Sequence, residues 1–377
     1  MKEIVTNNTS DNVNVTTQPE FNKNLNKTLA TSSMVPLKVI LIGIIALIVL
    51  TAVLVPVVLA TNKKDNNFKY KTSNKIPVII DVDEGGDDMI AYTIANNSGK
   101  YDILGITTVH PSYCIDNVTD VWLRYLAYMN FEAKVYRGEN HPLIRETQPI
   151  NFSHFYNIDF PNPKKTIESK SAVDFMYDTI KNHKTKVTLF LLAPLTNFAK
   201  VIQRDKTIVD NVKEIIIMGG TRGKGNMYGI NINAEYNVYQ DADAASIIFN
   251  SGATIRVMGC DITSNLELND EIYAKYLEMN TTSSILTYNL VKGTFLTWHD
   301  NIMHDPVTVL YHLNNKAVEL KSYYVEVNTT DPDVEGTNYG TMYFFEPKDN
   351  IKANIFMAIS IDLDTCWEIL EEMLAKY

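Results

Sequence analysis

Cysteines and basic residues are both scarce in this sequence, and each shortage excludes a class of protein. Only three cysteines occur in 377 residues, and no two of them form a CxxC pair. They therefore provide neither a disulfide framework nor a zinc cluster. The 34 lysines and arginines are outnumbered by 44 aspartates and glutamates, which gives a formal net charge of −10. Binding to a nucleic-acid duplex needs clustered basic side chains to displace phosphate counterions, so we expect no nucleic-acid partner.

The N-terminal segment also lacks any hydrophobic period. Residues 1–38 are rich in asparagine, threonine and serine. Such a segment cannot bury enough apolar surface to fold, so it is predicted to be a disordered polar tail. Disorder of the whole chain is excluded, because 45% of its residues are hydrophobic and can supply a core.

One long apolar run follows the tail. Val39–Ala60 carries a single polar side chain, that of Thr51. As a helix rising about 1.5 Å per residue, the run would extend roughly 33 Å, which is enough to span a bilayer. A cleaved signal peptide would begin nearer the N-terminus and be shorter. We therefore predict a single transmembrane helix that stays attached as a membrane anchor.

Two patterns give opposite indications of which side of the membrane the rest of the chain occupies. More lysines follow the apolar run than precede it, which favours a cytoplasmic C-terminal domain. N-glycosylation triplets favour the other side, and they occur at Asn117, Asn151, Asn280 and Asn328. The sequence therefore predicts a single-pass membrane protein without fixing its orientation.

After a charged linker over residues 61–76, short apolar runs alternate with amphipathic segments. Strands are predicted at Pro77–Val82, Ile103–Val109, Val187–Leu192, Glu214–Met218 and Thr254–Met258, and helices at Asn117–Tyr128 and Ala172–Lys181. The strand segments are apolar throughout, which predicts burial on both faces of a sheet. We therefore expect residues 77–377 to form an α/β domain, with a mostly parallel open sheet and helices on both faces. Ligands of such sheets bind beyond the carboxyl ends of the strands.

An acidic loop lies where the first strand is predicted to end. It contains Asp81, Asp83, Glu84, Asp87 and Asp88 within eight consecutive residues. Carboxylates this close raise one another's pKa, so a cation or protons must compensate them. A set of oxygen ligands favours calcium or magnesium over zinc, and calcium tolerates an irregular loop better. Alternatively, the last two aspartates only complement the N-terminus of the next helix, which leaves the other three acids unexplained.

Three further segments carry polar residues that suit a ligand site. The segment NAEYN places Glu235 and Asn237 two residues apart, so we expect them to share one face of a short extended segment. Carboxylates and amides can bind several hydroxyl groups. LLAPLTN at Leu191–Asn197 is consistent with an ordinary strand end, and HDPV at His304–Val307 with the start of a helix. A lone histidine is more often structural than catalytic.

Taken in order, these segments resemble the motifs of the inosine-uridine-preferring nucleoside hydrolase family. The acidic loop is similar to the family's DTDPGxDD, with Val82 in place of threonine and Glu84 in place of proline. LLAPLTN, the MGG…GN…NAEYN stretch from Met218, and HDPV follow in the family's order. The resemblance extends from Pro77 to at least Val307. The family's GN and HG segments are replaced by Pro111-Ser112 and His154-Phe155, and these departures affect substrate preference first.

The resemblance implies an enzyme that hydrolyses the N-ribosidic bond of nucleosides, giving ribose and a free base, with a calcium-activated water. The implied calcium ligands are Asp83, Asp88, the Leu192 carbonyl and Asp305. The implied substrate-binding residues are Asp87, Met218, Asn226, Glu235 and Asn237. Asp83 is the implied general base and His304 the acid that protonates the departing base, while Asp81 lies behind the ligands.

Two other functions are considered from the same residues. A nucleoside-binding membrane protein of the same fold, without turnover, is suggested by Glu84, Ser112 and the anchor. A calcium-stabilised structural domain is disfavoured, because it gives no reason for a second polar cluster at Glu235 and Asn237. The preferred base, the choice between ribose and deoxyribose, and the formation of a homo-oligomer are left open.

Overall fold

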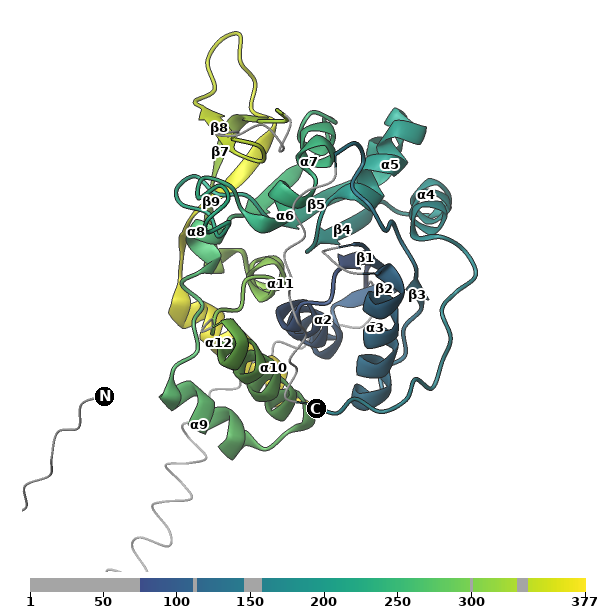
Figure 1. The fold of residues 1–377 in the computed structure, drawn as a ribbon, viewed down its shortest axis with the longest axis vertical. Helices are drawn as coiled ribbons and strands as arrows, with labels where there is room; N and C mark the ends of the chain where they lie inside the picture. The colour runs from purple at the N-terminus through teal and green to yellow at the C-terminus, as the bar shows by residue number, and fades with distance from the viewer. Residues whose placement is uncertain (1–74, 111–113, 146–157, 299–300, 331–337) are drawn as a thin grey trace, which may run out of the picture. The chain divides into compact units, whose positions relative to one another are not determined.

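The computed structural model describes residues 75–110, 114–145, 158–298, 301–330 and 338–377 (Figure 1). The predicted tail and the predicted anchor, Val39–Ala60, lie outside these residues. The segments that replace the family's GN and HG, Pro111-Ser112 and His154-Phe155, lie outside them as well. Within the described ranges, no helix has the length and apolar character needed to cross a membrane.

The described strands form a nine-stranded sheet in the order β3-β2-β1-β4-β5-β6-β9-β7-β8. Their bounds are β1 Ile76–Val82, β2 Tyr101–Thr108, β3 Val135–Tyr136, β4 Val187–Leu191, β5 Val212–Met218, β6 Ile255–Met258, β7 Val318–Val327, β8 Met342–Phe345 and β9 Ile355–Ile361. All pairings from β3 to β9 are parallel, whereas β7 pairs antiparallel with both β9 and β8. The predicted mostly parallel sheet is therefore confirmed, with an antiparallel extension at one edge.

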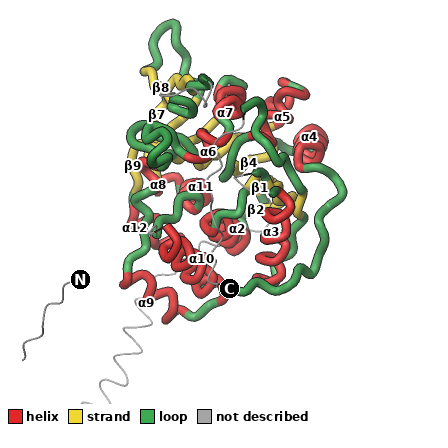
Figure 2. Tube along the Cα trace, in the orientation of Figure 1, coloured by secondary structure: helices red, strands yellow, loops and turns green. Residues whose placement is uncertain are grey.

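Helices cover both faces of this sheet (Figures 1 and 2). Their bounds are α2 Gly86–Ser98, α3 Ile115–Met129, α4 Ala172–Asn182, α5 Thr196–Arg204, α6 Tyr236–Gln240, α7 Ala242–Phe249, α8 Cys260–Thr263, α9 Asp270–Met279, α10 Thr282–Trp298, α11 Pro306–Leu313 and α12 Leu363–Leu374, with short 3-10 helices at Lys206–Asn211 and Asn315–Ala317. In Figure 1, α2, α3, α10, α11 and α12 lie on one side of the sheet and α4, α5 and α7 on the other.

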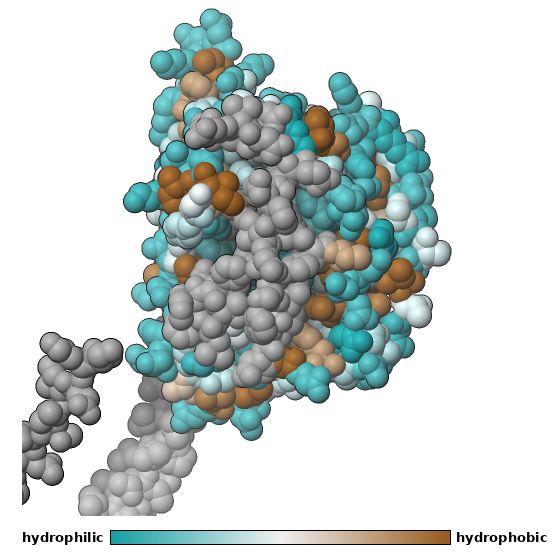
Figure 3. Space-filling model, in the orientation of Figure 1, coloured by the Kyte–Doolittle hydropathy of each residue, from teal (hydrophilic) through white to brown (hydrophobic). Residues whose placement is uncertain are grey.

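Successive residues of the central strands enter two different hydrophobic clusters. Val78 and Ile80 of β1 belong to the cluster that contains Trp122 of α3, whereas Ile79 belongs to the cluster that contains Phe198 of α5. All five side chains are fully buried. The continuous apolar runs of the sequence therefore reflect a sheet buried on both faces, as predicted. On the face shown in Figure 3, hydrophobic residues form separate patches among hydrophilic ones.

Candidate active site at the carboxyl ends of the strands

The carboxyl ends of β1, β4 and β5 bring three segments of the predicted site to one edge of the sheet. Asp83 follows the last residue of β1, Leu192 follows β4, and Met218 ends β5. Parallel strands end at the same edge, so these residues lie together although more than a hundred residues separate the first from the second. Asp305, which precedes α11, joins them there.

The acidic side chains converge around Gly85. Asp87, Asp88 and Asp305 each offer a carboxylate oxygen, and these oxygens lie within 4.8 Å of one another. A Cβ atom on Gly85 would lie 2.4 Å from Asp88 Oδ2, 2.9 Å from Asp87 Oδ1 and 3.3 Å from Asp83 Oδ1. The glycine therefore leaves the space into which three carboxylates of the loop point. Asp83 points toward the same space. The three carboxylate oxygens that lie within 4.8 Å of one another, however, belong to Asp87, Asp88 and Asp305 and not to Asp83.

Helix capping does not account for these acids. Helix α2 is preceded by Gly85, and no side chain caps it. Asp305 stands immediately before α11, with Pro306 in the first helical position, but its side chain makes no capping hydrogen bond either. Asp87 Oδ2 instead accepts hydrogen bonds from the backbone N–H groups of His304 at 3.1 Å and Asp305 at 3.4 Å. The loop after β1 and the start of α11 are thereby held against each other.

The buried carboxyl groups have strongly shifted pKa values. Burial, with a further contribution from nearby Asp87, raises the pKa of Asp83 to about 6. Burial and neighbouring aspartates raise the pKa of Asp88 and of Asp305 well above the usual range. Asp305 Oδ1 is buried without a hydrogen-bond partner in the described part of the chain. An all-oxygen donor set with this excess of negative charge fits a hard divalent cation.

Asp81 lies behind this cluster, in contact with the sheet. Its Oδ1 accepts hydrogen bonds from Thr107 Oγ1 at 2.5 Å and from Asn197 Nδ2 at 2.7 Å. Its Oδ2 is buried with no hydrogen-bond partner among the described residues. Burial raises the pKa of Asp81 to about 7. These contacts agree with the supporting position predicted for Asp81.

Two backbone carbonyls at the strand ends are held by Asn237. Its Nδ2 donates to the carbonyl oxygen of Leu192 at 2.8 Å and to that of Met218 at 3.2 Å. A carbonyl oxygen has two lone pairs, so Leu192 keeps one for a further partner. The structure thus brings three of the predicted site residues into direct contact.

Glu235 corrects one prediction about local structure. The expected extended segment over Glu235–Asn237 is wrong, because Glu235 is the N-cap of α6 and Asn237 lies in the first turn of that helix. The Glu235 carboxylate accepts from the backbone N–H groups of Asn237, Val238 and Gly220, at 2.9, 3.1 and 2.7 Å. A carboxylate that accepts hydrogen bonds from first-turn N–H groups favours the start of a helix. The two-residue spacing of Glu235 and Asn237 in the sequence does not reveal this capping role.

Glu235 also connects the two polar clusters electrostatically. Burial raises its pKa to about 7, and Asp83 adds to the rise. Glu235 in turn is one of the charges that raise the pKa of Asp305. Asn226 joins the same region, because its Oδ1 accepts a hydrogen bond from the backbone N–H of Tyr236 at 2.8 Å. The carboxylate cluster and the predicted ribose-binding residues therefore form one continuous site.

His304 adjoins the cluster through its backbone and is held by a threonine through its ring. Its Nδ1 lies 2.6 Å from the hydroxyl oxygen of Thr263, the last residue of α8. Its side chain is intermediate in exposure. Thr263 was not predicted as a site residue, since no motif marks it in the sequence.

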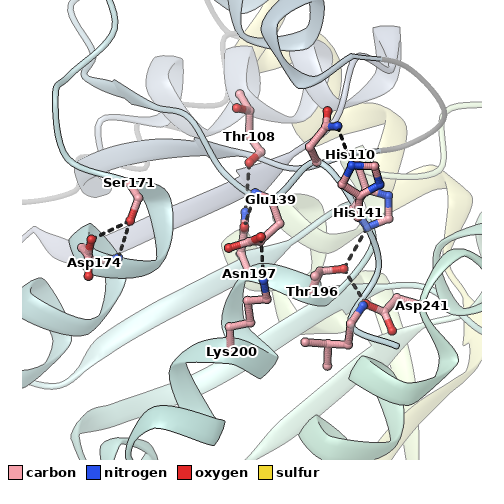
Figure 4. Close-up of polar contacts among 12 residues, drawn as sticks. Thr108, His110, Glu139, His141, Ser171, Asp174, Thr196, Asn197, Lys200 and Asp241 are labelled. Atoms are coloured by element: carbon pink, nitrogen blue, oxygen red, sulfur yellow. Dashed lines mark hydrogen bonds and ion pairs between the residues drawn. The ribbon is translucent and has the colours of Figure 1, made fainter. Parts of the chain in front are cut away.

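Asn197 is a second residue whose position the sequence did not predict. Its Nδ2 donates to the carbonyl oxygen of Thr108 at 3.0 Å, and its Oδ1 accepts from the backbone N–H of Glu139 at 3.0 Å (Figure 4). The same Nδ2 also donates to Asp81. Gly138, which precedes Glu139, must be a glycine, because a Cβ atom there would lie 1.9 Å from the Thr108 carbonyl oxygen. Asn197 belongs to the LLAPLTN motif, which was the only signal for it.

A neighbouring buried network of hydrogen bonds connects the segment after β3 to α7. His110 Nε2 lies 2.9 Å from Thr196 Oγ1, which donates to Asp241 Oδ2 at 2.6 Å (Figure 4). That oxygen also accepts from the backbone N–H of Leu143 at 2.8 Å. Asp241 is the N-cap of α7. The network fixes the segment after β3 above the ends of β2 and β4.

Comparisons with known proteins agree with this geometry. Residues 78–368 match the model of the family described as inosine-uridine preferring nucleoside hydrolase. The pyrimidine-specific ribonucleoside hydrolase RihB of Escherichia coli is 28% identical over 314 residues, which cover 80% of this chain and 98% of the relative. The solved structure of a purine-preferring ribonucleoside hydrolase from Gardnerella vaginalis superposes with a TM-score of 0.69 at 25% identity, covering 79% of this chain and 98% of that one. The plant nucleoside hydrolase PpNRh1, 23% identical with a TM-score of 0.70, shares the fold over 81% of this chain and 100% of its own.

Proposed function

We propose a calcium-assisted mechanism for this chain, which belongs to the inosine-uridine preferring nucleoside hydrolase family and hydrolyses nucleosides to ribose and a free base. The observation that carries the proposal is the convergence of buried aspartates around Gly85, with Asp305 Oδ1 lacking a hydrogen-bond partner among the described residues. Carboxylate oxygens packed in this way need a cation to remain ionised at neutral pH.

We assign the metal ligands to the residues that meet at the strand ends. Asp83, Asp88 and Asp305 would provide carboxylate oxygens, and Leu192 would provide the carbonyl oxygen that Asn237 already orients. Only oxygen donors are involved, which favours calcium or magnesium over zinc, and calcium tolerates an irregular loop better. When bound, calcium would supply positive charge that orients the attacking water and makes it more acidic.

The protein must stabilise opposite charges on the two halves of the substrate. Breaking the bond between C1′ and the base nitrogen builds positive charge on the sugar and leaves the bonding electron pair on the base. The buried carboxylates favour the positively charged sugar, and they are already in place before the reaction, which makes this stabilisation effective.

We assign the two proton transfers to Asp83 and His304. Asp83 accepts a proton from the attacking water, whose hydroxyl group forms the new bond to C1′. His304 gives a proton to the departing base. The overall reaction consumes one water, and the proton gained by Asp83 returns to His304 through solvent.

The ribose is proposed to bind the residues around the metal ligands: Asp87, Met218, Asn226, Glu235 and Asn237. Glu235 illustrates why such binding is compatible with its structural role. A carboxylate has about four lone-pair sites. Three of them receive backbone N–H groups, which leaves one for a hydroxyl group. We further propose that the domain is tethered to a membrane through Val39–Ala60, on the strength of that apolar run.

The decisive experiment measures the release of reducing sugar from a panel of purine and pyrimidine nucleosides by the purified chain. Chelation should abolish the release, and calcium should restore it more effectively than magnesium. Asp305→Asn provides the matched control, because the amide keeps the shape but loses the charge that binds the ion. Activity that persists unchanged in chelator, in both proteins, would refute the assigned metal site.

A further inference from the structure

The hydroxyl group of Thr263 is placed where it can control the ring of His304. Thr263 is fully buried, and its Oγ1 lies 2.6 Å from His304 Nδ1. No other hydrogen bond of this hydroxyl group occurs within the described ranges. A buried hydroxyl group is costly without a partner, so the contact with the ring is maintained.

The backbone fixes this contact from both sides. Leu268 N–H donates to the carbonyl oxygen of Asn301 at 2.9 Å, and Met303 N–H donates to that of Leu266 at 3.0 Å. The turn after α8 and the segment before His304 are therefore paired like two short strands. Beyond them, the His304 backbone N–H is bound by Asp87. The imidazole thus stands between α8 and the acidic loop, with little freedom to change its position.

The contact also distinguishes the two nitrogens of the ring. Nδ1 is occupied by Thr263, whereas Nε2 makes no hydrogen bond to any residue that the structure describes. A hydroxyl group can accept a hydrogen bond from Nδ1–H whether or not the ring carries its second proton. The proton that the ring can release is then the one on Nε2.

We propose that Thr263 is a positioning residue, which holds Nδ1 of His304 so that Nε2 is the atom that protonates the departing base. This inference rests on the proposed function, in which His304 is the acid. In the step concerned, the C1′–N bond breaks, its electron pair moves to the base, and the Nε2 proton transfers to that base. The ring keeps its Nδ1 proton and its hydrogen bond to Thr263.

The test compares two substitutions of the same residue in the purified full-length chain. Thr263→Val keeps the branched shape but removes the hydroxyl group, and Thr263→Ser keeps the hydroxyl group. Thr287→Val is the matched control, because Thr287 is also fully buried but donates only within α10, to the carbonyl oxygen of Ser283. Each variant is assayed on inosine or uridine, whichever the wild type hydrolyses faster, and on a nitrophenyl riboside, whose leaving group departs as a stable anion.

Thr263→Val should lower kcat on the nucleoside by about tenfold or more, a part of the usual general-acid contribution, while kcat on the nitrophenyl riboside changes by less than about twofold. KM and calcium affinity should also stay within about twofold, because neither the ligands nor the ribose contacts change. Thr263→Ser should restore most of the nucleoside activity. Retained activity on the nitrophenyl riboside shows that the valine variant is folded, and Thr263→Ala replaces it if that activity is absent.

Equal losses on both substrates, or a serine variant no better than the valine variant, would overturn the positioning role. So would a fully active valine variant. Other results would contradict the proposed function itself: a wild type without chelator-sensitive activity, or a His304→Ala variant that loses activity equally on both substrates. If His304→Ala is selective and Thr263→Val is neutral, only the role of Thr263 is refuted.

Discussion

In the metal-free protein, Asp81 should make stability fall as the pH rises. Its side chain is fully buried, and burial raises its pKa from 3.8 to about 7. Between these two values, the folded state keeps a proton that the unfolded state has released. The free energy of unfolding therefore decreases with increasing pH in this window, and the loss is complete above the folded pKa.

The size of the effect follows from the shift. Three pKa units at about 1.4 kcal/mol each give an upper limit of about 4 kcal/mol between pH 4 and pH 7. Asp81→Asn should remove this dependence, since an amide does not titrate. The amide oxygen can still accept from Thr107 and Asn197, while its NH2 group takes the place of Oδ2, which has no partner in the described part of the chain. That unpaired NH2 lowers stability by about 1 to 3 kcal/mol at every pH, so the slope is the quantity to compare.

The assay is urea unfolding in chelator at half-unit steps from pH 4.5 to pH 7.5, followed by tryptophan fluorescence. Trp122 is a suitable probe, because it is fully buried and its Nε1–H donates to the Asp83 carbonyl oxygen. Relative to wild type, Asp81→Asn should gain stability steadily as the pH rises. Asp102→Asn, at an exposed position of β2, serves as the control and should show no gain. Parallel curves for wild type and Asp81→Asn would refute the reasoning.

Three further predictions concern the site and the anchor. Asp88→Ala should abolish calcium binding and turnover, whereas Asp83→Asn should retain more calcium affinity and still lose turnover. Calorimetry measures the calcium affinity, and sugar release measures the turnover. Wild-type values in both variants would contradict the proposed ligand set. His304→Ala should reduce hydrolysis of inosine about a hundredfold more than that of a nitrophenyl riboside, without changing calcium affinity, and equal losses would remove its role as the acid. Removal of residues 1–60 should yield a soluble folded domain, as judged by circular dichroism and gel filtration, whereas release of the full-length chain from membranes by alkali would show that Val39–Ala60 is not an anchor.

The parallel part of the fold was predictable because its strands carry a strong local signal. Ile79 and Ile216 lie in runs that are apolar on both faces, and such runs are typical of strands that helices cover on both sides. The antiparallel extension carried a weaker signal. β7 mixes exposed, intermediate and buried positions along its length, and both of its partners follow it in the chain. Its pairing is decided by contacts that a local pattern does not contain.

The same distinction separates the predicted from the unpredicted parts of the site. Asp83, Asp87 and Asp88 lie within six consecutive residues, so their density alone indicated a cation site, and their convergence around Gly85 fits it. The importance of Asn197 and Thr263 depends on partners 116 and 41 residues away in the sequence. Composition and spacing cannot reveal such pairs. The roles proposed for all these residues remain predictions for the experiments above.

Asn197 has a consequence for the order in which this protein folds. One amide joins Asp81, Thr108 and Glu139, which lie 116, 89 and 58 residues away. Contacts of such long range form late, because the entropy of closing large loops must be overcome before they can stabilise the chain. The acidic loop is therefore completed only when three distant segments have docked. A partly folded chain would offer no assembled form of the proposed calcium site, so an ion that binds there would stabilise the native state alone and shift the folding equilibrium toward it.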